Sequence, residues 1–80
     1  MNQKLLAAKA IFPHDKVEPG KEVKFRQGEK EYNCQVTNVT PMEGNKFIVW
    51  LKDSVSKIRL FWFNGAFHLD LPDGPEVIIV

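Results

Sequence analysis

The chain has 80 residues, of which 44% are hydrophobic and 26% are charged, and it contains one Cys. A chain of this length forms a single domain, residues 1–80, and buries about 60–65% of the surface that its unfolded form exposes, so we expect a binding surface and not an enclosed active site. The lone Cys excludes an internal disulfide and a zinc site built on paired cysteines, and the formal net charge of +1 provides no global field that would attract nucleic acid or a membrane.

The N-terminal part of the chain predicts a short helix followed by an irregular connector. Residues 1–12 are rich in Leu and Ala, and Pro13 cannot continue a helix. Pro19-Gly20 is a turn signal, so residues 13–20 are expected to connect the helix to the rest of the domain. Lys9 interrupts the apolar run, and no stretch approaches the ~20 apolar residues of a membrane helix. We therefore expect a cytoplasmic protein without a membrane partner.

Everything from residue 21 onward predicts strands, which would form a β-barrel over 21–80. Charged and apolar residues alternate in 22–26, and uncharged polar and apolar residues alternate in 32–37, which is typical of a half-buried hairpin. By composition, residues 40–45 are a loop, and the apolar run 46–52 is a third strand.

The strongest local signal is Asn64-Gly65 between the apolar runs 57–63 and 66–71. This dipeptide is preferred in two-residue type I′ hairpin turns, because both central residues must adopt positive φ. The turn sets a register with Phe63 opposite Ala66. In that register one face is apolar, whereas the other combines rings with charges. The expected inner residues are Ile58, Leu60, Trp62, Phe67, Leu69 and Leu71, and the outer ones are Arg59, Phe61, Phe63, His68 and Asp70.

Residues 76–80 could add a last strand after the turn at 72–75. Five or six short antiparallel strands after a short helix indicate a mainly β fold, a small barrel of the SH3, Sm or OB kind. The alternative is a small open α+β sheet with the N-terminal helix packed on one face.

The outer face of the third, fourth and fifth strands is the candidate site. It combines aromatic rings, on which bases can stack, with cations that can bind phosphates, as single-stranded RNA or DNA requires. The prediction is a non-catalytic binding module. Its candidate contact residues are Trp50, Arg59, Phe61, Phe63, His68, Lys46, Lys52 and Lys57.

Two other interpretations of these rings stay open at this stage. Trp50, Phe61 and Phe63 could pack as core beneath the helix or the last strand. Alternatively, they could mediate a protein–protein contact or homo-oligomeric assembly, or the C-terminal run 77–80 could pair with the sheet edge of another chain.

The sequence predicts no catalysis, no metal and no cofactor. His68 and Asp70 share a strand face, but no nucleophile in a suitable setting accompanies them, and Arg59 opposite Asp70 is an ordinary cross-strand ion pair. Cys34 and the two histidines do not have the spacing of metal ligands, and Cys34 alternates inward as a small buried side chain.

One segment resembles a known family. Residues 47–58 read FIVWLKDSVSKI. They are similar to the third-to-fourth strand segment of bacterial Hfq proteins, which are Sm-like RNA chaperones that begin with a helix and form rings. The resemblance implies a small barrel and RNA binding. The Lys-His motif of the Hfq uridine-binding rim has no counterpart here, so the resemblance assigns no binding residue.

Overall fold

The computed structural model describes residues 12–80, which form a closed six-stranded antiparallel barrel. This confirms the predicted barrel over the open sheet. The helix expected over 1–12 lies outside the described residues, except for Phe12, and the connector 13–20 contains turns and bends only. Within the described part, no helix has the length and hydropathy needed to cross a membrane. The strands are β1 (Glu22–Gln27), β2 (Lys30–Met42), β3 (Lys46–Lys52), β4 (Lys57–Phe63), β5 (Ala66–Leu69) and β6 (Glu76–Ile79).

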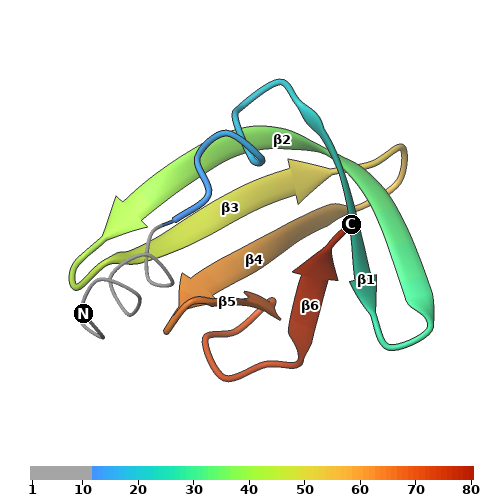
Figure 1. The fold of residues 1–80 in the computed structure, drawn as a ribbon. Helices are drawn as coiled ribbons and strands as arrows, with labels where there is room; N and C mark the ends of the chain where they lie inside the picture. Colours follow the sequence, from blue (N-terminus) through green and yellow to red (C-terminus); the bar gives the residue numbers. More distant parts are fainter. Residues whose placement is uncertain (1–11) are drawn as a thin grey trace.

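Each strand pairs with the next one along the chain, and β6 pairs with β1 to close the barrel (Figure 1). The long strand β2 curves across the fold, so that residues 30–35 pair with β1 and residues 35–42 pair with β3. The β2–β3 register shifts between Val36 and Asn38, which is a β-bulge. A bulge bends its strand, and this one lies where β2 passes from one partner to the other.

The prediction of a loop over 40–45 was wrong for its first three residues. Strand β2 continues to Met42, and Pro41 pairs with Phe47. Proline lacks an N–H and is tolerated on a strand that needs no donor on one side. Among the described strands, this end of β2 has β3 as its only neighbour.

The β4–β5 hairpin has the predicted register. Phe63 lies opposite Ala66, and Trp62 opposite Phe67. Asn64 and Gly65 have φ of 55° and 80°, as a type I′ turn requires. The placement of Leu71 on the inner face was wrong: this side chain is 50% exposed, because β5 ends at Leu69 and the chain turns away at Asp70, where φ is 70°.

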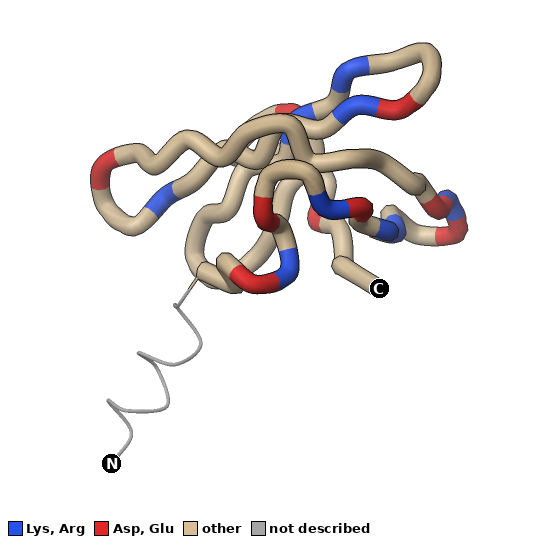
Figure 2. The backbone as a smooth tube through the Cα atoms, turned by 90° about the horizontal axis from the view of Figure 1, so that it is seen from above, with Lys and Arg blue, Asp and Glu red and all other residues tan. Residues whose placement is uncertain are grey.

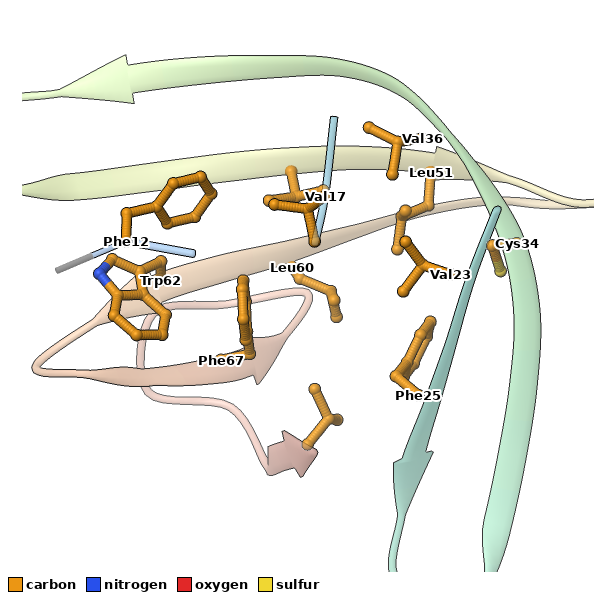
Figure 3. Packing of buried hydrophobic residues seen from close by; sticks show 12 residues of the cluster. Phe12, Val17, Val23, Phe25, Cys34, Val36, Leu51, Leu60, Trp62 and Phe67 are labelled. Atoms are coloured by element: carbon orange, nitrogen blue, oxygen red, sulfur yellow. The ribbon is translucent and has the colours of Figure 1, made fainter. Parts of the chain in front are cut away.

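The core lies inside the barrel and is apolar (Figure 3). Phe12, Trp62 and Phe67 meet at one end, while Val23, Phe25 and Cys34 lie toward the other. The inward positions predicted for β4 are confirmed, and Cys34 is a small buried side chain as expected. The buried residues are Phe12, Val17, Val23, Phe25, Cys34, Val36, Val49, Leu51, Leu60, Trp62, Phe67 and Val77.

The C-terminal strand is part of the closed sheet. Residues 76 and 77 of β6 pair with β5, and residues 78 and 79 pair with β1. The strand therefore bridges its two neighbours. This pairing removes the reason for expecting residues 77–80 to add to the sheet of another chain.

Candidate functional site

The candidate site is the outer face of β3, β4 and β5. Because side chains alternate along a strand, the residues opposite one another across these strands share this face. Trp50 lies opposite Arg59, and Ile48 opposite Phe61, which in turn lies opposite His68. The structure thus brings the predicted residues of the third, fourth and fifth strands onto one surface.

The three rings of this face are outside the core. Trp50, Phe61 and Phe63 are each half-buried, and none belongs to the buried cluster or to the side chains packed against it. Within the described residues these rings are therefore not part of the core, and the helix beneath which they were expected to pack lies outside those residues. The barrel interior is filled by the opposite, inward positions of the same strands, so the outer rings have no place in it.

Hydrogen bonds to β2 hold Trp50 in place. The indole Nε1 donates to Thr40 Oγ1 at 3.0 Å, and Thr37 Oγ1 donates to the Trp50 carbonyl at 3.2 Å. A ring fixed at both its backbone and its polar atom loses little conformational freedom when a ligand stacks on it.

Cations lie over the rings. Lys46 Nζ is 5.0 Å from the centroid of Phe63. The Arg59 guanidinium lies between two rings, 5.9 Å from the centroid of Trp50 and 5.6 Å from that of Phe61. Arg59 Nε also donates to the Asp70 carboxylate at 3.3 Å and to its carbonyl at 3.2 Å, which confirms the expected ion pair. Each ring is thus beside a positive charge, within the usual cation–π range.

Two hollows flank the Trp50 ring. The larger, of about 490 Å³, is lined by Thr37, Asn38, Trp50, Leu51, Lys52 and Lys57. The smaller, of about 250 Å³, is lined by Trp50, Lys57, Ile58, Arg59 and Asp70. We call the larger hollow the Trp50 groove. Its volume lies within the range of small-ligand sites, about 300–1,000 Å³.

Two lysines face each other at one end of the Trp50 groove. Lys52 and Lys57 are direct cross-strand partners, an arrangement that costs stability because their charges repel. Neither forms an ion pair within the described part of the chain. The neighbouring carboxylate of Asp53 instead accepts hydrogen bonds from the backbone N–H groups of Val55 and Ser56, at 2.8 and 2.6 Å.

The hydrogen bonds to Asp53 lower the pKa of its carboxyl group, so Asp53 is a fixed anion that also shapes the turn between the lysines. Within β2, burial and, to a smaller extent, the charge of Asp53 raise the pKa of the Cys34 thiol. Cys34 is therefore kept as a neutral thiol and is a poor nucleophile.

His68 has a structural contact at the edge of this face. Its Nδ1 lies 3.0 Å from the Gly74 carbonyl, and because a carbonyl can only accept, the histidine donates. This bond joins β5 to the turn that leads into β6. His68 is therefore partly committed to holding this turn.

Charge is dispersed over the molecule as a whole. In Figure 2, positive and negative positions are scattered over the tube of the described residues. Cationic character is therefore a local property of the face around Trp50, and not of the whole surface.

Sequence reasoning missed three polar residues of the site, which are Thr37, Asn38 and Thr40 of β2. A signal was present: inward residues recur every second position up to Val36, and the next one is Val39, three positions later. Such a break in the alternation indicates a bulge. Among residues 12–80, no group of three or more His, Cys, Asp or Glu side chains is placed to hold a metal ion.

The comparisons with known proteins add no relative. No protein family, no curated protein and no solved structure matches this chain.

Proposed function

We propose that this protein is a small non-catalytic module that binds single-stranded RNA or DNA through the outer face of β3, β4 and β5. The observation that carries the proposal is the Trp50 groove, a fixed aromatic ring beside an open hollow with two lysines that form no ion pair within residues 12–80. Stacking of a base on such a ring contributes about 1–3 kcal/mol, and the lysines bind the adjacent phosphates.

The positions of the other rings and cations support the same function. Phe61 and Phe63 continue along β4 from Arg59, and Lys46 lies over Phe63 at the far end of the face. A strand lying across the sheet would meet rings alternating with cations. Successive bases and phosphates alternate in the same way along a nucleic-acid strand.

The near-neutral net charge sets the expected strength of binding. Four cations lie on this face, Lys46, Lys52, Lys57 and Arg59, and Arg59 is already paired with Asp70. With three or four phosphate contacts, the logarithm of the binding constant should fall with the logarithm of salt concentration with a slope of about −2 to −3. Binding is therefore expected to be moderate and to weaken at high salt.

The test is a fluorescence-anisotropy titration of labelled oligonucleotides at several salt concentrations, with wild type and Trp50→Ala. We expect wild type to bind single strands in preference to duplex, with the slope given above. Loss of one stacked base should weaken the variant by about tenfold or more. If wild type binds no oligonucleotide even at low salt, the proposal is wrong.

A second candidate is assembly of this chain with itself, or with another protein, through the same face. The observation that favours it is the apolar row formed by Ile48 and Phe61, both half-buried side chains that an interface would cover. Sedimentation that shows a stable dimer or ring, together with no oligonucleotide binding, would support this candidate over the first.

Either function suits a cytosolic barrel module of the SH3, Sm or OB kind. A reducing compartment would keep the free thiol of Cys34 intact.

A further inference from the structure

Arg59 is held along one edge of its guanidinium group and free along the other. Its Nε donates to the Asp70 carbonyl at 3.2 Å and to the Asp70 carboxylate at 3.3 Å. Both terminal nitrogens are without a hydrogen bond or ion pair within residues 12–80. The planar group therefore keeps its terminal N–H donors in a fixed orientation, and these donors form the fork that binds phosphate in a bidentate way.

The chain reverses at Asp70 in a way that turns its acceptors toward Arg59. Strand β5 ends at Leu69, and Asp70 has a φ of 70°, which residues other than Gly, Asn and Asp seldom adopt. The Asp70 N–H donates to the Arg59 carbonyl at 2.9 Å, in addition to the two bonds that Asp70 accepts from Nε. Asp70 is thereby placed to set the direction of the guanidinium group.

Arg59 lines the smaller hollow beside Trp50, which we call the Arg59 hollow. Two cations and one carboxylate, those of Lys57, Arg59 and Asp70, are part of its lining, so one positive charge is left over. Lys57 has no ion pair in the described part of the chain. A ligand group with a single negative charge would balance this lining, and a phosphodiester is such a group.

We infer that the Arg59 hollow is a phosphate site of the bound nucleic-acid strand, in which Arg59 and Lys57 bind a phosphodiester and Asp70 is the positioning residue of Arg59. The inference rests on the proposed function and adds a subsite to it. Trp50 and Lys57 line both this hollow and the Trp50 groove. A base stacked in the groove would therefore have the backbone of its own strand beside the hollow.

A phosphate suits the Arg59 hollow better than the edge of a base does. A neutral base would take the charge of Lys57 out of water without giving it a counterion, which is costly. A phosphodiester has oxygens for both Lys57 and Arg59, and hydrogen bonds between ionised groups are about twice as strong as those between neutral ones.

The first experiment titrates oligo(U), oligo(C) and oligo(A), each of about eight nucleotides, with wild type, Arg59→Gln and Arg59→Lys at several salt concentrations. Arg59→Gln should weaken binding of all three by the same factor, about tenfold or more, and make the salt slope shallower by about one. Arg59→Lys keeps the charge but loses the fork. It should keep the wild-type slope and bind about threefold more weakly.

The second experiment compares Asp70→Asn with Asp70→Gly. Both variants remove the negative charge, and both residues adopt a positive φ readily, so the pair differs in the side-chain oxygen that accepts from Arg59 Nε. Asp70→Asn should bind oligo(U) at least as tightly as wild type, because a repelling charge is gone. Asp70→Gly should bind about threefold or more weakly than Asp70→Asn, the effect of one hydrogen bond.

The outcomes separate the two claims. If wild type binds and Arg59→Gln has no effect, or weakens the three oligonucleotides by different factors, Arg59 does not bind phosphate and this inference fails alone. Equal affinities of Asp70→Asn and Asp70→Gly, or of Arg59→Lys and wild type, would show that the orientation of Arg59 is not used. If wild type binds none of them, the proposed function fails and this inference fails with it. Urea midpoints check that each variant is folded.

Discussion

The inner and outer faces of β3, β4 and β5 belong to the same short strands but have different roles. Leu60 is fully buried among apolar neighbours, whereas the next residue, Phe61, is half-buried on the outside beside the Arg59 guanidinium. The inner face has its partners within the barrel, whereas the outer face has an open groove and two lysines, Lys52 and Lys57, without an ion pair in the described part of the chain. Substitutions of residues that are adjacent in sequence should therefore change different properties, which are stability on the inner face and binding on the outer face.

The largest expected effect is on the inner face. Leu60→Ala should lower the free energy of unfolding by about 2–5 kcal/mol, because it leaves a cavity in a packed core. Phe61→Ala should cost about 1 kcal/mol, since only part of its ring is removed from water. Urea denaturation of both variants measures the difference. Equal losses would show that the outer ring belongs to the core after all.

Gly74→Ala tests the turn between β5 and β6, which His68 of the outer face contacts. A Cβ at Gly74 would lie 2.3 Å from the Leu69 carbonyl oxygen, so the turn must shift, and with it the carbonyl that His68 binds. We expect a loss of about 1–3 kcal/mol. Gly28→Ala is the control: its φ is 61° with open space around it, and only the backbone strain of about 1 kcal/mol applies. A Gly74 variant no less stable than the control would contradict the close contact.

Lys57→Gln should affect binding and not folding. Removing one phosphate contact should make the salt slope shallower by about one, measured by the same titration at several salt concentrations. Stability should stay the same or rise by a few tenths of a kcal/mol, because the repulsion with Lys52 is relieved. Lys30→Gln, in the β1–β2 hairpin outside the groove, should leave the slope unchanged.

The smallest expected effect concerns Asp53. Its pKa is lowered in the folded state, so its stabilising contribution is complete at neutral pH and is lost as the pH falls below the range of a free carboxyl group. Asp53→Asn keeps an oxygen for the Val55 and Ser56 N–H groups but cannot titrate. Urea midpoints between about pH 7 and pH 3 should therefore fall less in the variant than in wild type. An equal fall would mean that Asp53 does not contribute to acid sensitivity.

Much of the fold could be predicted because its signals are local. Asn64-Gly65 determined both the turn and the register of β4 and β5, and alternation then sorted Trp62 from Phe61. Closure of the barrel by β6 was harder to predict, since pairing of β6 with β1 joins residues far apart in sequence. The placement of Leu71 was wrong because the apolar alternation continues in the sequence, whereas the backbone turns away at Asp70.

The site was predicted only in part. Rings and cations on β3 and β4 follow from alternation, so Trp50, Arg59 and Phe61 were found together. Asn38 was missed because a bulge of one residue changes which face it occupies, and the break in the alternation between Val36 and Val39 was not recognised as a bulge. The position of the Arg59 guanidinium beside both the Trp50 and the Phe61 ring could not be predicted from the sequence either, since it depends on side-chain orientation.

Intrinsic fluorescence tests the central claim most directly, because the two tryptophans lie on opposite faces of the same sheet. Trp62 is buried and its Nε1 has no hydrogen-bond partner among the described residues, so Trp62→Phe removes no such bond there and leaves Trp50 as the only tryptophan. Adding a single-stranded oligonucleotide should quench this variant, whereas Trp50→Phe, which reports from the core, should not change. Quenching of Trp62 alone, or of neither tryptophan at low salt, would contradict a binding face built around Trp50.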